Sequence, residues 1–260
     1  MSQPIDYKES KHKQSNNNPC KYIAMWSGPR NLSTAMMYCF AQREDCKVVD
    51  EPFYAAYLAA TGIEHALFKE IILDGETNPE EVIKLCTKEK QQLPVFYQKH
   101  MTKHMIPSIE REWIHKVCNV FLIRDPARVI ASYHAKQQDP ELSDIGVKEQ
   151  FELFDLVSQK TGKAPTVIDS ADILASPEAM LRALCKAVDI EFQTSMLSWN
   201  TGPKLYDGVW APHWYKSVWK STGFAAPDSR TVQVPEHLLG LLDTANSYYQ
   251  RLKEYAIVSD

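Results

Sequence analysis

Glycine is scarce in this chain, with nine residues in 260, and an excess of positive charge is absent, because 29 lysines and arginines face 33 aspartates and glutamates and the formal net charge is −4. The common nucleoside-triphosphate loop needs G-x-x-x-x-G-K-[ST], and no stretch of the sequence has this pattern. A domain that binds nucleic acid is usually strongly basic. These two absences argue against a P-loop of the common type and against a nucleic-acid partner.

Long apolar runs and paired cysteines are absent as well. No apolar run approaches the roughly 20 residues that a membrane-spanning helix needs, and the first 19 residues are polar, unlike a signal peptide. The six cysteines show no close pairing and no cysteine–histidine cluster with zinc spacing. We therefore expect a cytoplasmic protein with free thiols, no membrane contact and no metal.

What is present fits one domain of ordinary composition. Hydrophobic residues make up 44% of the chain and charged residues 24%. Residues 1–20, which contain SNNNP, are predicted to form a flexible tail, and residues 21–260 a single domain. The sequence leaves a homo-oligomer open.

Short apolar strands alternate with helical patterns along this domain. The strands are expected at 21–26, 47–50, 94–98, 118–123 and 166–169. The helices are expected at 33–43, 79–91, 104–116, 127–137 and 146–161, and a last one near 235–255. This alternation predicts an α/β fold in which a P-loop-like parallel sheet of about five strands is covered by helices on both faces. Ligands of such sheets bind beyond the carboxyl ends of the strands.

The first strand runs directly into a turn that is suited to an anion. The turn and the helix start that follows contain the candidate anion-binding residues Ser27, Gly28, Pro29, Arg30, Asn31, Ser33 and Thr34. N–H groups at a helix start are unpaired and carry the positive end of the helix dipole, and Arg30 adds a planar cation. The alternative is an ordinary turn capped by Asn31 or Ser33.

A second strand, Val120 to Ile123, also ends in a cation, Arg124. Asp125-Pro126 stops this strand and starts a helix, since proline suits a first helical turn. Ser132 comes eight residues after Arg124, about two turns into that helix. Taken alone, this segment is better explained by an Arg124–Asp125 pair and a surface serine.

Together the two segments resemble the sulfotransferases that use 3′-phosphoadenosine 5′-phosphosulfate (PAPS) and release 3′-phosphoadenosine 5′-phosphate (PAP). The segment from Val167 to Phe192 is similar to a later strand, turn and helix of that family. The resemblance implies that the first loop holds the 5′-phosphosulfate and that Arg124 and Ser132 hold the 3′-phosphate. Asn31 and Leu32 depart from the family's usual Ser-Gly, so Leu32 must turn away from the nucleotide.

The resemblance also implies catalytic residues. Glu51, just past the second strand, matches a carboxylate base found in several branches of the family, although a solvated turn before Pro52 is the alternative. Lys99 lies just past the third strand and, with Arg30, would neutralise the leaving phosphate, while His100 is a rival base. In the aromatic segment Lys204 to Phe224, Lys220 and Ser221 are candidates for the 3′-phosphate. The segment from Tyr54 to Leu73 is the expected acceptor wall, or else a plain amphipathic helix.

The sequence therefore favours an enzyme that moves a sulfuryl group from PAPS to a hydroxyl or amine of a small molecule, with a carboxylate base and no metal. Two alternatives stay open. One is a P-loop phosphotransferase that uses ATP, and the other is a sulfotransferase-like module that binds a nucleotide without turnover.

Overall fold

The sheet is the centre of the computed structural model, which describes residues 20–88, 91–136, 139–227 and 231–259. Its five parallel strands lie in the order β2-β3-β1-β4-β5. They are β1 (Lys21–Ser27), β2 (Cys46–Asp50), β3 (Val95–Met101), β4 (Cys118–Ile123) and β5 (Thr166–Asp169). The predicted fold class is confirmed. The predicted tail, except for Cys20, lies outside the described residues.

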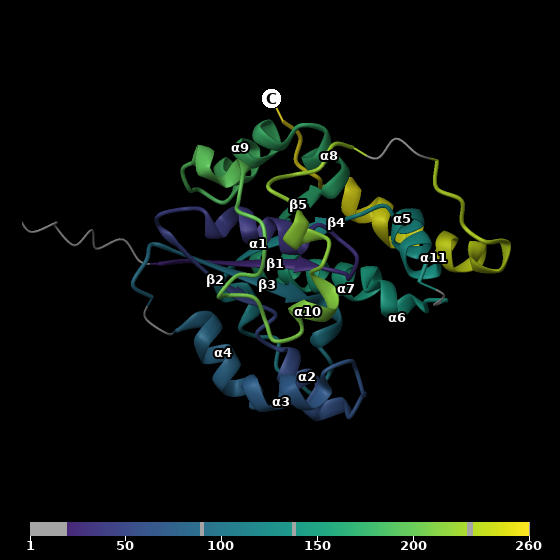
Figure 1. Cartoon of the computed structure of the whole chain (residues 1–260), viewed down its shortest axis with the longest axis horizontal. Helices are drawn as coiled ribbons and strands as arrows, with labels where there is room; N and C mark the ends of the chain where they lie inside the picture. Colours follow the sequence, from purple (N-terminus) through teal and green to yellow (C-terminus); the bar gives the residue numbers. More distant parts are fainter. Residues whose placement is uncertain (1–19, 89–90, 137–138, 228–230, 260) are drawn as a thin grey trace, which may run out of the picture.

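Helices cover both faces of this sheet (Figure 1). The longer ones are α1 (Ser33–Ala41), α4 (Pro79–Thr87), α5 (Pro126–His134), α7 (Val147–Thr161), α9 (Pro177–Ala187) and α11 (Leu239–Lys253). The shorter ones are α2 (Tyr54–Thr61), α3 (Phe68–Asp74), α6 (Leu142–Ile145), α8 (Ser170–Ala175) and α10 (Ala211–Trp214). In the view of Figure 1, α8 and α9 lie at the top of the molecule, and α2, α3 and α4 lie at the bottom.

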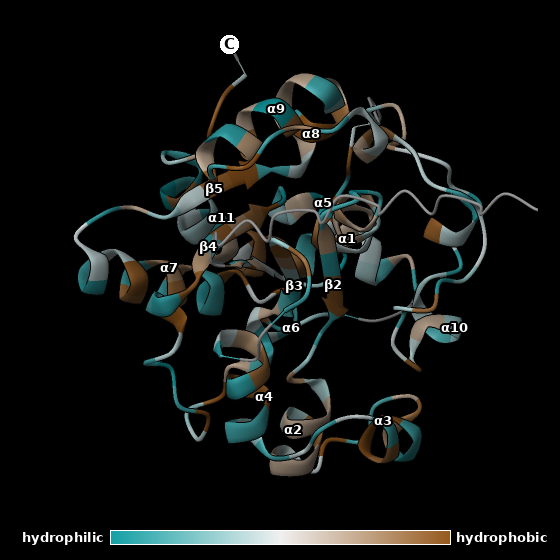
Figure 2. Cartoon of the chain, turned by 90° about the vertical axis from the view of Figure 1, so that its left-hand side faces the viewer, coloured by the Kyte–Doolittle hydropathy of each residue, from teal (hydrophilic) through white to brown (hydrophobic). Residues whose placement is uncertain are grey.

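Alternation along each strand divides the core into two clusters. In β1, Ile23 and Met25 join the cluster that contains residues of α1 and α9, whereas Ala24 and Trp26 join the cluster that contains residues of α4, α7 and α11. Successive side chains of a strand point to opposite faces, and strands buried on both faces read as continuous apolar runs. Figure 2 shows these hydrophobic strands enclosed by helices with hydrophilic outer surfaces.

The helix predicted at 104–116 is wrong. Strand β3 continues to Met101, and the following stretch contains only two 3₁₀ turns, η1 (Thr102–His104) and η2 (Ile114–Lys116). Pro107 lacks a backbone N–H and disfavours a helical residue before it, so the segment winds irregularly with Ile109 and Trp113 buried.

The segment from Tyr54 to Leu73 forms two helices rather than one. Helix α2 ends at Thr61, and the next residue, Gly62, has a left-handed φ of 67° that stops the helix. The chain then turns, and helix α3 begins at Phe68. Three further 3₁₀ turns lie in the last third of the chain: η3 (Thr194–Leu197), η4 (Val218–Lys220) and η5 (Glu236–Leu238).

All six cysteines are among the described residues, and each is an unbonded thiol. Across the described ranges, no helix combines the length and the apolar character needed to cross a membrane.

Candidate functional site

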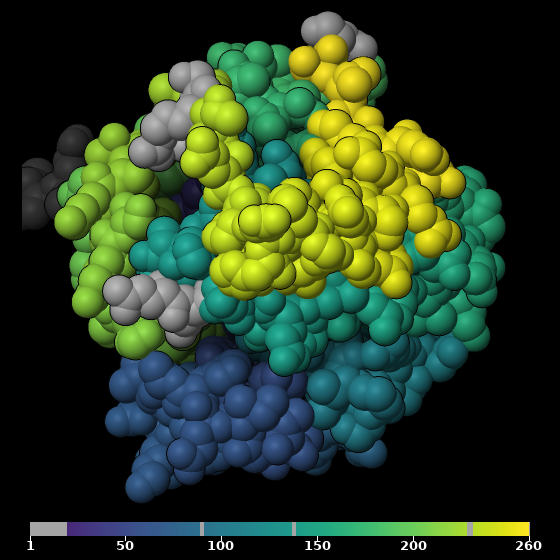
Figure 3. All heavy atoms as spheres, turned by 90° about the vertical axis from the view of Figure 1, so that its right-hand side faces the viewer, coloured from purple at the N-terminus to yellow at the C-terminus, as the bar shows by residue number. Residues whose placement is uncertain are grey.

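A cavity of about 940 Å³ lies at the carboxyl ends of the strands. Its wall includes four charged residues that lie at or near the carboxyl ends of four different strands: Arg30, Glu51, Lys99 and Arg124. In Figure 3 a hollow opens between the green late part of the chain and the teal part, with purple N-terminal atoms at its depth. The four predicted charged residues therefore meet at the expected edge of the sheet.

The first loop presents a helix start to this cavity. Helix α1 begins at Ser33 without a capping side chain, and Ser33, Thr34 and Ala35 line the wall. Since the first N–H groups of a helix have no partner within it, this end of α1 offers donors for an anion. Asn31 donates from Nδ2 to the carbonyl of Leu122 at 2.8 Å, which fastens the loop to β4.

Arg30 and Arg124 meet although they belong to different motifs. The Arg124 guanidinium donates to the backbone carbonyl of Arg30, and Arg30 lies over the ring of Tyr133, 5.3 Å from its centroid. Arg30 has a left-handed φ of 56°. Ser132 also lines the cavity, on helix α5, which begins at Pro126 as predicted and is capped by the Asp125 side chain. The two predicted anion motifs therefore form one wall.

Two of the predicted anion-binding residues, Ser27 and Gly28, lie behind the cavity wall and do not line the cavity. Ser27 is fully buried and does not line the cavity. Gly28 also lies outside the lining, and a Cβ there would come within 2.2 Å of the Ile145 carbonyl oxygen. Gly28 thus allows the turn before α7 to approach the loop, and only a residue without a side chain fits.

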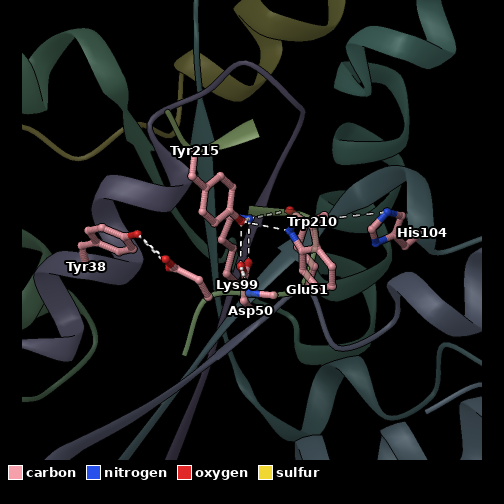
Figure 4. A network of polar contacts seen from close by, with 9 residues as sticks. Tyr38, Asp50, Glu51, Lys99, His104, Trp210 and Tyr215 are labelled. Carbon is pink, nitrogen blue, oxygen red and sulfur yellow. Dashed lines mark hydrogen bonds and ion pairs between the residues drawn. The ribbon is translucent and has the colours of Figure 1, made fainter. Parts of the chain in front are cut away.

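Lys99 lies at the floor of the cavity within a ring of acceptors (Figure 4). Its Nζ donates to Asp50 Oδ1 at 2.8 Å, to Glu51 Oε1 at 2.5 Å and to the Tyr215 hydroxyl at 2.8 Å. Burial alone would lower the pKa of Lys99, but Asp50 and Glu51 outweigh it and raise this pKa well above its usual value. The lysine is therefore a fixed cation.

Two adjacent carboxylates reach Lys99 because the backbone changes direction between them. Asp50 pairs with Lys99 in the register of β2 and β3, so both side chains point to the same face. Glu51 would ordinarily point to the other face, but its φ of 40° turns its carboxylate back. Burial raises the pKa of Glu51, and Lys99 opposes this rise.

His100 lies outside the cavity, so its predicted catalytic role does not fit the structure. It follows Lys99 in β3 and therefore points to the opposite face of the sheet. There it stacks on Trp26 with ring centroids 4.4 Å apart, and its Nε2 contacts Gln98 Oε1 at 3.0 Å. Burial, aided by Lys99, lowers the pKa of His100 to about 3. It is a neutral core residue.

His104, which the sequence pattern did not place in the site, lines the cavity. It is 2% exposed, stacks on Tyr54 and Tyr57, and its Nε2 lies 3.8 Å from Glu51 Oε2. Burial lowers its pKa well below the usual value, so the ring is neutral. Lys103, whose pKa is also lowered by burial, lines the same part of the cavity.

The late segment, residues 204–224, closes one side of the cavity. Ser221 lines the wall, but its Oγ donates to the Val218 carbonyl and accepts from Trp199. Lys220 is exposed and lies outside the lining, so its predicted cofactor contact does not fit this structure. Trp214 lines the cavity instead, with the Arg30 guanidinium 5.6 Å from its ring centroid.

Sequence reasoning missed Asp50 and Tyr215. Asp50 directly precedes the predicted base at a strand end, and this position was a usable signal. Tyr215 is 116 residues from Lys99 along the chain. Nothing in its aromatic neighbourhood distinguishes it from the tryptophans that pack around it.

The fold and the site define an α/β protein in which an uncapped helix start and a buried lysine–carboxylate cluster face one cavity. A family model described as "Sulfotransferase domain" matches residues 21–256. The chain belongs to this sulfotransferase family, and the resemblance seen in the sequence is confirmed.

One curated relative is branched-chain-amino-acid aminotransferase-like protein 1 of Arabidopsis thaliana. It is 38% identical over 233 residues, which are 90% of this chain and 42% of that protein. The chain thus spans less than half the length of this relative.

Two solved structures share the fold. The sulfotransferase from Alicyclobacillus acidocaldarius superposes with a TM-score of 0.54 at 9% identity, covering 91% of this chain and 97% of that one. The sulfotransferase domain of the Synechococcus PCC 7002 olefin synthase gives a TM-score of 0.50 at 15% identity, covering 92% and 98%.

Proposed function

We propose that this chain is a PAPS-dependent sulfotransferase that acts on a hydroxyl or amine of a small molecule in the cytoplasm. One observation carries the proposal: the two anion motifs form one wall of a cavity that has Lys99 and Glu51 at its floor. The cavity is large enough for a nucleotide and a small acceptor side by side.

The residues present fit such a donor. The uncapped start of α1, with Ser33 and Thr34, would hold the 5′-phosphosulfate, and Arg124 with Ser132 would hold the 3′-phosphate. Arg30 would add a cation beside the phosphosulfate. An ammonium and two guanidiniums around one cavity supply the charge that binds a multiply anionic nucleotide.

The chemistry needs one bond broken and one formed. The acceptor oxygen or nitrogen bonds to the sulfuryl sulfur, the bond from sulfur to the 5′-phosphate oxygen breaks, and its electron pair stays on the leaving phosphate of PAP. Glu51 takes the acceptor's proton as general base. Lys99 and Arg30 neutralise the charge that grows on the leaving phosphate, so positioning and electrostatics lower the barrier.

Calorimetry with Arg124→Ala tests this assignment. We expect the loss of one charge-assisted bidentate contact to weaken PAP binding by roughly 10- to 100-fold. Binding of adenosine 5′-diphosphate, which lacks the 3′-phosphate, should change only a few-fold. Arg128→Ala is the matched control, because Arg128 lies four residues further on, in the first turns of α5, and does not line the cavity.

Three results would contradict the proposal. Equal losses for the two nucleotides would remove Arg124 from the 3′-phosphate site. Tighter binding of ATP than of PAP would favour the phosphotransferase alternative. Binding of PAP without any transfer from radiolabelled PAPS, across a panel of alcohols, phenols and amines, would favour the non-catalytic module.

A further inference from the structure

The Lys99 ammonium has no hydrogen left for a ligand. A lysine carries three N–H donors and no acceptor. In this structure the three are given to Asp50, Glu51 and Tyr215 at 2.8, 2.5 and 2.8 Å. Lys99 nevertheless lines the cavity and is the cation nearest to the candidate base. A phosphate oxygen can therefore bind Lys99 only if one of its three partners leaves.

Two of these partners are tied to each other. Asp50 Oδ2 accepts from the Tyr215 hydroxyl at 2.7 Å and from the backbone N–H of Gly208 at 3.2 Å. The Tyr215 oxygen accepts in addition from Trp210 Nε1 at 3.2 Å. Asp50 and Tyr215 are 7% and 5% exposed. Moving either one would break contacts that do not involve Lys99.

Glu51 is held less firmly. Its Oε1 accepts from Lys99, while Oε2 lies 3.8 Å from Nε2 of the neutral His104 ring, which is beyond hydrogen-bond range. Figure 4 shows Glu51 between Lys99 and His104, on the other side of Lys99 from Tyr215. Of the three partners of Lys99, Glu51 is the one that can leave at the smallest cost.

We infer, on the basis of the proposed function, that Lys99 exchanges partners when the phosphosulfate donor binds. Asp50 and Tyr215 keep the ammonium in place, and a phosphate oxygen of the donor replaces Glu51. Without the donor, base and cation neutralise each other. With the donor bound, Glu51 is released beside the acceptor. Asp50 and Tyr215 are thus positioning residues, and the donor itself activates the base.

The exchange of partners should change the number of protons that the protein binds. The titratable groups that face Glu51 are Asp50, Tyr54, Lys99, Lys103, His104 and Tyr215. Burial raises the pKa of Glu51 and Lys99 is the strongest influence that lowers it. When Lys99 gives up its contact with Glu51 for a phosphate oxygen of the donor, the pKa of Glu51 therefore rises further. PAP binding should take up protons at Glu51, and PAP affinity should fall as pH rises from the pKa of the free protein to that of the complex.

Calorimetric titration of PAP in buffers of different ionisation enthalpy measures this uptake. We expect wild type to take up a fraction of a proton that Glu51→Gln does not. Because Glu51→Gln also removes the competitor for Lys99, it should bind PAP more tightly, by about tenfold. Equal uptake in the two proteins, or weaker PAP binding by Glu51→Gln, would overturn the exchange.

A second pair of variants tests the positioning residues. Tyr215→Phe removes only the hydroxyl that holds Lys99 and Asp50, so kcat should fall roughly tenfold, with little change in the KM of the acceptor. Lys99 should also stay closer to Glu51 and lower the pKa of this base, so the acid limb of the pH profile of kcat should move to lower pH. Tyr206→Phe is the matched control, because the Tyr206 hydroxyl lacks a hydrogen-bond partner among the described residues.

The outcomes separate the inference from the proposed function. Wild type that binds no PAP would contradict both. Wild type that binds PAP and turns over PAPS, while Tyr215→Phe behaves like Tyr206→Phe, would contradict the inference alone. The tyrosine pair decides the question even if Glu51→Gln does not fold.

Discussion

At the scale of the residue, two candidate site residues have unusual backbones. Arg30 and Glu51 are two of the four non-glycine residues with positive φ in the described ranges; the others are Leu67 and Asp189. Such conformations cost of order 1–3 kcal/mol each and persist where the surrounding structure imposes them. At Glu51 the strain has a visible result, since it brings a second carboxylate to Lys99.

This geometry makes Glu51→Gln informative. The substitution keeps the shape of the side chain and removes the base, so we expect turnover to fall by roughly 10²–10⁴. Initial rates with radiolabelled PAPS check this. His100→Ala, on the opposite face of the sheet, should leave kcat per folded molecule nearly unchanged. Full loss of turnover in His100→Ala, with Glu51→Gln active, would make the histidine the base.

The sequence predicted which residues meet at the cavity where the prediction followed the alternation of strand residues and the ends of strands. Arg30, Glu51, Lys99 and Arg124 each follow or end an apolar run, and parallel strands bring such positions to one edge. The alternation of β3 also separates Lys99 from His100, so the sequence itself offered the means to reject His100. Tyr215 was out of reach because its contact depends on how the late segment folds over the cavity.

At the scale of the element, the predicted strands agree best with the structure, and the long connection after β3 agrees least. Each strand is a short apolar run with few alternatives in a parallel sheet. The stretch 104–116 has apolar residues at helical spacing, yet Pro107 and the burial of Trp113 in the core impose turns. Local spacing could not reveal this, because the deciding contacts are tertiary.

The last strand depends on one carboxylate that joins two helices to it. Asp169 is fully buried, caps α8 through Ala171 N–H at 2.8 Å, and accepts from the Tyr249 hydroxyl and Lys253 Nζ of α11 at 2.5 and 2.8 Å. A single side chain thus satisfies a helix start, a phenol and an ammonium. Its removal leaves all three without this partner.

We therefore expect Asp169→Ala to lower the free energy of unfolding by about 2–4 kcal/mol. Asp172→Ala is the matched control, since Asp172 is half-exposed, contacts only Lys253 among these groups, and should cost less than about 1 kcal/mol. Urea unfolding monitored by circular dichroism measures both. Equal losses would mean that Asp169 contributes no more than a surface pair.

At the scale of the whole molecule, the candidate site joins segments that are distant along the chain. Arg124 contacts the first loop across 94 residues of sequence, and Tyr215 contacts β3 across 116. A nucleotide in this cavity would touch the β1 loop, the start of α1, helix α5 and the late segment at once. Binding should therefore stabilise the native state as a unit.

PAP should raise the melting temperature, because a ligand that binds only the native state stabilises it by mass action. At a PAP concentration 100 times the Kd the gain is about 2.7 kcal/mol, which for a chain of this size corresponds to roughly 5–10 °C. Adenosine 5′-diphosphate at the same concentration should give a smaller shift, since it lacks the group that Arg124 and Ser132 would hold. In Arg124→Ala the two shifts should become alike. A shift with ATP but none with PAP would mean that the cavity is built for a different nucleotide, and that the resemblance of the two motifs extends to the fold but not to the donor.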